Sequence, residues 1–314
     1  MTGAEGLERR RARQGQLAIV VAAVAWSTAG LAQRELDASP ATQVAGRAVF
    51  AGIALLALVA VTERGGTLAA FRAMGRSGLA MAVFLAISSG AFLFALNSTT
   101  VANVLFMQAA APMIAALLGW ALLSERVDGR TWIALLLAGV GVVLMAAGSL
   151  DAGIAAVGLP FLMTASFAAV IVIARHRQDV SMMPATCASQ AIVVVACLPF
   201  VAPGSASDSD WAIFAALGVG QMGLGLAALT IGARLIPPAQ VAVISLLEVV
   251  LGPLWVWLAY DERPSLATFV GGLVVVAAVV VQAWGLSPKG TVPPEARRPH
   301  EGTGPPGTVP EAHV

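Results

Sequence analysis

Residues 237–263 read PPAQVAVISLLEVVLGPLWVWLAYDER, an apolar stretch with one carboxylate, Glu248, near its middle. About 20 apolar residues are enough for an α-helix to cross the hydrocarbon core of a bilayer. An ionised carboxylate inside that core is costly and usually marks a functional position. We therefore predict a membrane-spanning helix that carries a functional group at its centre.

A second stretch, residues 100–126, is built in the same way. It reads TVANVLFMQAAAPMIAALLGWALLSER and aligns with the first stretch without a gap, at an offset of 137 residues. The matches that apolar composition does not explain are Trp120/Trp257, Glu125/Glu262, Arg126/Arg263 and Thr131/Thr268. This alignment predicts an internal repeat and therefore two halves of related structure. Ala111 is the counterpart of Glu248, so the central carboxylate belongs to one half only.

The composition is that of a polytopic membrane protein. Hydrophobic residues make up 58% of the chain and charged residues only 11%, whereas about a quarter of the residues are charged in an ordinary soluble domain. The net charge of +1 gives no reason to expect a nucleic acid partner. The spacing of Cys187 and Cys197 suits neither a disulfide framework nor a metal site. We expect no metal and no cofactor.

Ten apolar windows have about the length that a helical span needs. They cover residues 17–32, 42–61, 78–96, 99–123, 131–148, 154–174, 182–201, 211–231, 238–260 and 266–284. The first window follows a basic leader, a pattern that a cleaved signal peptide also shows. We favour an uncleaved first helix, because its removal would reverse every loop assignment that follows.

The basic residues support this count. With the N-terminus inside, fifteen Lys and Arg residues fall in cytoplasmic segments. Only Arg34 and Arg263 fall outside, and Arg47 lies within a span. Such a bias agrees with the positive-inside rule, and a missed helix would invert it downstream. We predict an all-α integral membrane protein in the cell membrane, with ten transmembrane helices and both termini in the cytoplasm.

Five spans per half is an odd number, so equivalent helices must cross the membrane in opposite directions. The predicted segments are a basic cytoplasmic leader (1–14), a first five-helix repeat (15–150), a second, inverted five-helix repeat (151–286) and a disordered cytoplasmic tail (287–314). Inverted repeats are a recurrent construction of secondary transporters, which bind substrate near the midplane between the repeats.

Two segments carry a resemblance to a known family. Residues 99–126 and 236–265 are similar to the fourth-to-fifth and ninth-to-tenth helix signatures of EamA-type transporters in the drug/metabolite transporter superfamily. The resemblance extends over about residues 15–286, and implies a ten-helix inverted-repeat fold and the export of amino acids, other metabolites or drugs. The chain departs from the family pattern at Trp26-Ser27, where a Trp-Gly pair is common, which leaves close packing there in question.

Glu248 and Arg47 are the principal candidates for a substrate or proton site. At about 1.5 Å per residue, Glu248 lies roughly 15 Å into a span that begins at Pro238. Arg47 lies roughly 9 Å below the outer end of the second helix. Both could face a polar cavity and bind a zwitterionic or charged substrate, and Glu248 could also carry a proton. The alternative for each is a fixed ion pair or hydrogen-bonded charge that joins two helices.

Other polar or aromatic residues within spans are candidates for the lining of the same cavity: Trp26, Asn103, Gln108, Gln190, Gln221 and Ser245. Hydrogen bonds between helices explain such polar residues equally well. For Trp26 the alternative is a packed or interfacial aromatic ring.

These observations favour a secondary transporter over an enzyme. The expected partners are the lipid bilayer, a small-molecule substrate and a proton as coupling ion. Two alternatives from other classes remain open, an intramembrane enzyme acting on lipid-linked substrates and a non-transporting scaffold. The sequence leaves the substrate, the direction of transport and the oligomeric state open.

Overall fold

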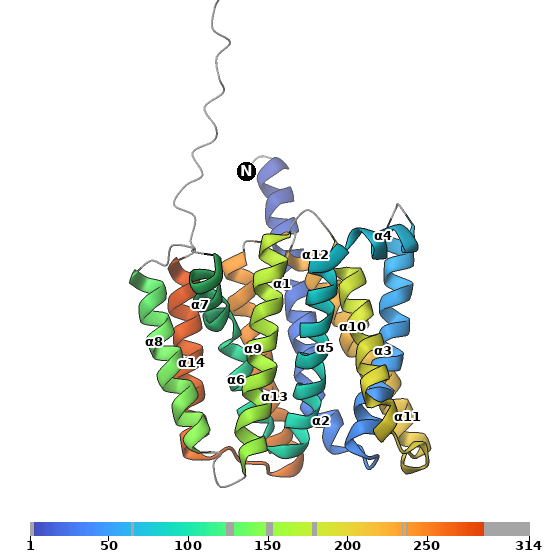
Figure 1. Ribbon diagram of the computed structural model, residues 1–314. Coiled ribbons are helices and arrows are strands. Elements are labelled where there is room, and N and C mark those ends of the chain that lie inside the picture. The colour runs from blue at the N-terminus through green and yellow to red at the C-terminus, as the bar shows by residue number, and fades with distance from the viewer. Residues whose placement is uncertain are drawn as a thin grey trace, which may run out of the picture.

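The computed structural model describes residues 3–63, 66–123, 129–148, 153–177, 181–233, 235–236 and 238–285. These residues are predominantly helical and include no strand. The long helices run roughly side by side in one bundle, and α1 begins at the same end at which α14 ends (Figure 1). The short helix α4 (Thr67–Ala73) lies across that end of the bundle (Figure 1).

The first half of the chain forms seven further helices. They are α1 (Gly3–Ser27), α2 (Ala29–Arg34), α3 (Pro40–Thr62), α5 (Gly75–Ser98), α6 (Val101–Ala109), α7 (Ala111–Leu123) and α8 (Gly129–Ala147). The second half forms α9 (Ile154–His176), α10 (Met183–Cys197), η2 (Leu198–Phe200), η3 (Pro203–Ser205), α11 (Asp208–Ala215), η4 (Ala216–Leu224), α12 (Gly225–Ala233), α13 (Pro238–Tyr260) and α14 (Leu266–Gly285). Residues 3–14 of the predicted leader are part of α1, while the predicted tail and the Glu125-Arg126 loop lie outside the described residues.

The lengths and compositions of the helices identify a multi-pass membrane protein. Among the described residues, seven helical stretches are long and apolar enough to cross a bilayer. Three shorter apolar stretches are Thr131–Ala147, Ile244–Tyr260 and Leu266–Val281. These three would complete the ten crossings, and that count remains a prediction.

Local sequence explains where several helices begin or break. Ser39, Thr100 and Ser207 each accept a hydrogen bond from a backbone N–H in the first turn of α3, α6 and α11, respectively, as N-cap residues typically do. Helix α6 ends at Ala109 and α7 begins at Ala111, directly before Pro112. Proline removes a backbone donor and favours such a break.

The two halves of the chain pack against each other throughout the bundle. Helix α1 contacts α12 and α13, α5 contacts α9, α3 contacts α10, and α8 contacts α14. At the α8–α14 crossing, a Cβ atom added to Gly141 would lie 2.6 Å from the carbonyl oxygen of Gly271. Only glycine permits the two backbones to approach this closely. The largest buried cluster includes Val44, Leu93, Leu105 and Val256, and so also joins both halves.

Candidate functional site: a polar cavity between the halves

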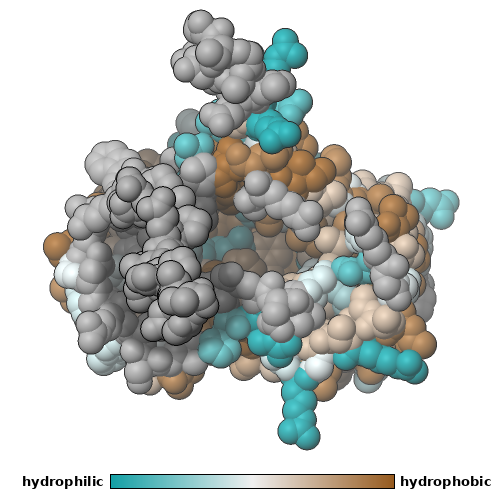
Figure 2. Space-filling model, turned by 90° about the horizontal axis from the view of Figure 1, so that it is seen from above, coloured by the Kyte–Doolittle hydropathy of each residue, from teal (hydrophilic) through white to brown (hydrophobic). Residues whose placement is uncertain are grey.

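A cavity of about 160 Å³ lies where helices of both halves meet. Its lining consists of Trp26 (α1), Arg47 (α3), Leu85, Ser88, Ser89 and Phe92 (α5), Gln108 (α6), Met163 and Phe167 (α9), Gln221 and Met222 (η4) and Glu248 (α13). Glu248 is about 15 Å along α13 from Pro238 at 1.5 Å per residue, which is half the thickness of a bilayer core. The face at the N-terminal end of the bundle is hollowed near its middle (Figure 2).

Arg47 is a buried cation with no carboxylate partner among the residues that the structure describes. The residue is 4% exposed. Nη1 donates a hydrogen bond to Gln221 Oε1 (3.2 Å) and Nη2 donates to Ser89 Oγ (2.9 Å). The guanidinium carbon lies 5.9 Å from the centroid of the Phe92 ring, and Nε has no hydrogen-bond partner. Because no carboxylate of the described residues lies within 4.0 Å of the guanidinium, its charge is available to an anionic ligand.

Glu248 places a carboxylate in the same cavity. The residue is 8% exposed, and its Oε1 atom accepts a hydrogen bond from Gln108 Nε2 at 3.5 Å. This distance is long for a hydrogen bond, and no other donor of the described residues bonds to the carboxylate. Arg47 and Glu248 therefore line one cavity without forming an ion pair with each other.

Gln221 connects three elements around the cavity. It lies in η4, which is a π-helix, a rare conformation that occurs frequently at functional sites. Its Oε1 atom accepts from Arg47, and its Nε2 atom donates to the backbone oxygen of Trp26 (3.1 Å). In return, Trp26 Nε1 donates to the backbone oxygen of Gln221 (2.9 Å). These bonds join α1, α3 and η4 and fix the orientation of the Arg47 guanidinium.

The indole ring of Trp26 requires a glycine opposite it. A Cβ atom added to Gly225 would lie 2.4 Å from Trp26 Nε1. Ser27, next to Trp26, is fully buried and accepts a hydrogen bond from Trp255 Nε1 (3.0 Å). The departure from the family pattern at Trp26-Ser27 is thus accommodated by a hydrogen bond between α1 and α13.

The structure places three of the predicted cavity residues elsewhere. Asn103 is buried on α6 and donates to the backbone oxygen of Ala156 (3.2 Å), at the junction with α9. Gln190 is fully buried on α10 and donates to Ser189 Oγ (3.1 Å). Ser245 is half-buried on α13, outside the cavity lining. Of the eight candidates, Arg47, Glu248, Trp26, Gln108 and Gln221 come together.

Other lining residues did not stand out in the sequence. Ser88 and Ser89 are adjacent hydroxyls in the middle of an apolar window, which is a usable signal. Ser88 donates to the backbone oxygen of Met163 (3.0 Å) and so joins α5 to α9. Phe92 and Phe167 carry no such signal, because an apolar residue in a span can face lipid, core or cavity alike.

Comparisons with known proteins agree with this architecture. The model of the EamA-like transporter family matches the chain twice, over residues 13–147 and 154–284. No curated protein matches the sequence. Twelve chains of solved structures match. One of them, titled "Crystal structure of protein", has 19% sequence identity and a TM-score of 0.63, and the match covers 87% of this chain and 98% of that one. At this identity the similarity concerns the fold alone.

Proposed function

The chain belongs to the EamA-like transporter family, and from this premise we propose that it is a secondary transporter that exports small metabolites. It is a membrane transporter of the drug/metabolite transporter superfamily. The single observation that carries the proposed mechanism is that Arg47 and Glu248 line one cavity without neutralising each other. A guanidinium and a carboxylate held in this way are complementary to the two charges of a zwitterion.

The size and the lining of the cavity favour a molecule of amino acid size. Pockets for drug-sized ligands measure roughly 300–1,000 Å³, whereas this cavity measures about 160 Å³. Phe92, Phe167 and Met222 supply an apolar surface beside the two charged groups. The proposed substrate is therefore a small zwitterion with an apolar side chain, its carboxylate on Arg47 and its ammonium group on Glu248.

Alternating access between two inverted repeats, residues 15–150 and 151–286, is the proposed mechanism. The contacts between helices support it, since several have a counterpart in which the halves are exchanged. Helix α1 packs on α12 and α13, and α9 packs on α5 and α7, which are the matching pairs if α1 corresponds to α9. The cavity lies at the centre of these contacts. The strong bias of basic residues supports a cell-membrane orientation with both termini in the cytoplasm.

Glu248 is also the proposed carrier of a coupling proton. It is a carboxylate at the depth of the bilayer centre and has one weak hydrogen bond, to Gln108. Carboxylates in such positions commonly form part of proton pathways in transporters. Binding of a proton and of the substrate ammonium group would then exclude each other, which couples their movements.

Transport by purified protein in proteoliposomes tests the proposal. Wild type, Glu248→Gln and the control Glu63→Gln, which makes the same chemical change at the end of α3, are compared with a mixed pool of amino acids and metabolites, with and without a pH gradient. We expect wild type and the control to move at least one zwitterion, and Glu248→Gln to lose movement driven by the gradient. Undiminished transport by Glu248→Gln would refute the role of this carboxylate.

A further inference from the structure

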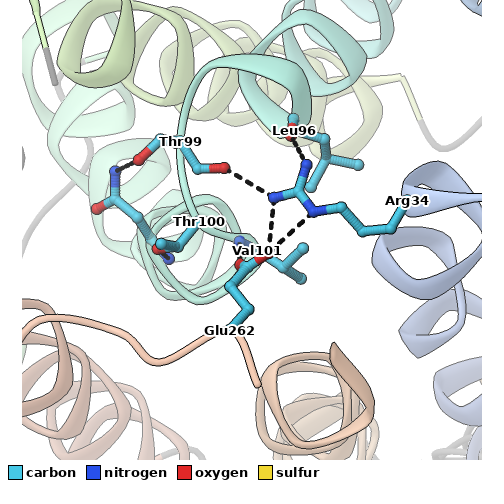
Figure 3. A network of polar contacts seen from close by, with 7 residues as sticks. Arg34, Leu96, Thr99, Thr100, Val101 and Glu262 are labelled. Carbon is cyan, nitrogen blue, oxygen red and sulfur yellow. Dashed lines mark hydrogen bonds and ion pairs between the residues drawn. The ribbon is translucent and has the colours of Figure 1, made fainter. Parts of the chain in front are cut away.

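A second polar cluster (Figure 3) surrounds Arg34, at the end of the bundle opposite the N-terminus, where α2 lies (Figure 1). Arg34, the last residue of α2, forms an ion pair with Glu262 (Nη2 to Oε2, 2.8 Å), and its Nε atom donates to the same oxygen (2.9 Å). The guanidinium also donates to the backbone oxygens of Leu96 and Thr99, the latter at 3.1 Å. These carbonyls lie where α5 ends, so a single side chain satisfies two free acceptors at that helix end.

The second carboxylate oxygen of Glu262 binds the N-terminal end of another helix, α6. Oε1 accepts a hydrogen bond from the backbone N–H of Val101 (2.7 Å), the first residue of α6. A carboxylate at this position satisfies a free backbone donor, and its negative charge interacts favourably with the helix dipole. Because Glu262 lies in the connection between α13 and α14, the Arg34–Glu262 pair joins the second half of the chain to α2, α5 and α6 of the first half.

The cluster lies where three segments that line the cavity reach this end of the bundle. Arg34 follows Trp26 by eight residues, Thr99 follows Phe92 by seven, and Val101 precedes Gln108 by seven. A polar pocket of about 290 Å³ borders the pair and is lined by Arg34, Thr99, Thr100, Gly148, Glu262, Ser265 and Thr268. The pair thus forms part of the wall of a vestibule at that end.

A further polar layer closes the same side. Gln33 donates to Gln43 Oε1, which also accepts from Asn97 Nδ2 (3.1 Å). Gln43 in turn donates to the backbone oxygen of Ala38 (2.8 Å). This layer holds together elements of the first half only, namely α2, α3 and α5. Arg34–Glu262, by contrast, joins the two halves and must break if they separate. Tyr260–Glu35 and Asp37–Asp210 are further hydrogen bonds between the halves at this end.

We propose that Arg34 and Glu262 form the outer gate of the central cavity, a proposal that rests on alternating access. Their side chains are 25% and 18% exposed, respectively, so the pair is neither a freely solvated contact, which would contribute little, nor a fully buried one, which would be very costly to break. When the halves separate, water in the vestibule can hydrate the guanidinium and the carboxylate. It can also hydrate the backbone groups to which these side chains were hydrogen-bonded. The pair favours the state that is closed to the outside.

Thiol labelling tests the gate without requiring transport. The background protein carries Cys187→Ala and Cys197→Ala, which remove both cysteines, and Ser89→Cys as a reporter in the cavity. A membrane-impermeant maleimide is added to intact cells that express the protein. With the gate intact we expect slow labelling. Arg34→Gln and Glu262→Gln should each accelerate it roughly tenfold, because each removes charge-assisted hydrogen bonds.

Neighbouring residues of the same loop offer matched controls. Arg263 and Asp261 form an exposed ion pair with each other, so Arg263→Gln and Asp261→Asn remove the same charges without touching the gate. If the controls accelerate labelling as much as the gate variants, or if the gate variants do not accelerate it, the gate is refuted. Rapid labelling of the background protein, in which Arg34 and Glu262 are intact, also refutes it.

Two further measurements keep the test decisive. Glu262→Asp retains the charge but withdraws the carboxylate by one carbon, so it should also accelerate labelling if Glu262→Gln does not fold. In inside-out vesicles, the gate variants should label more slowly than the background. Faster labelling from outside with unchanged labelling from inside would support the gate and contradict alternating access, so the two proposals fail separately.

Discussion

Replacement of Arg47 by glutamine separates a functional from a purely structural role for this residue. The substitution removes two hydrogen bonds with a charged donor, to Gln221 and Ser89, each of which contributes about 1.5–3 kcal/mol. It also removes the cost of holding a cation away from water, which is several kcal/mol for a buried ion. The glutamine amide can still bond to one of the two partners.

These contributions oppose each other, so the free energy of unfolding of Arg47→Gln should lie within about 2 kcal/mol of that of the wild type. At a shift of about 2–4 °C per kcal/mol, Tm should change by less than about 8 °C. Transport should fall much further. Loss of one charge-assisted hydrogen bond to a substrate carboxylate lowers kcat/KM about 10- to 150-fold.

The assay combines thermal unfolding of detergent-purified protein with kcat/KM in proteoliposomes, for the zwitterion that wild type moves. Arg263→Gln is the control, since this arginine is exposed and pairs with Asp261. A large fall in Tm, with transport reduced only in proportion to folded protein, would show that Arg47 is structural. Unchanged transport would also refute the reasoning.

Three further substitutions probe the surroundings of the site. Gly225→Ala places a Cβ atom 2.4 Å from Trp26 Nε1, so the indole must move, and we expect a roughly tenfold loss of kcat/KM in the transport assay. Gly271→Ala places a Cβ atom 2.6 Å from the Gly141 carbonyl oxygen, and should lower the free energy of unfolding by about 1–3 kcal/mol, measured by thermal unfolding, without changing KM. Gln190→Leu removes a buried amide whose Oε1 has no partner, so stability should hold or rise by about 1 kcal/mol with unchanged transport; a large loss of transport would place Gln190 in the substrate pathway after all.

The depth of a residue in the membrane could be predicted from the sequence, but the direction in which its side chain points could not. Glu248 and Arg47 stood out because a charge within an apolar window is costly wherever it points. Gln108 and Asn103 lie five residues apart on the same helix, yet only Gln108 lines the cavity. Both faces of that helix contact other helices, so apolar periodicity did not distinguish them.

The Arg34–Glu262 contact could not be predicted from the sequence, for a different reason. Arg34 and Glu262 are 228 residues apart in the chain. From the sequence, Arg34 is notable only as one of the two basic residues predicted to lie on the outer side of the membrane. An alignment of the repeats identifies Glu262 as the counterpart of Glu125, but not as the partner of Arg34. Such a contact depends on how the two halves dock, which is tertiary information.

The π-helix η4 makes the site sensitive to the length of the chain as well as to its composition. At the end of the bundle opposite the N-terminus this span is anchored by Asp210, which accepts hydrogen bonds from the backbone N–H groups of Ser207 and Asp37. Its other end is anchored where Gly225 packs on Trp26. Deletion of one residue such as Gly220 would let the segment become an ordinary α-helix, and the wide turn from which Gln221 bonds to Arg47 and Trp26 would be lost. A single-residue deletion here should therefore preserve a helix and abolish the cavity, so gaps in this segment would separate relatives that share the site from those that share only the fold.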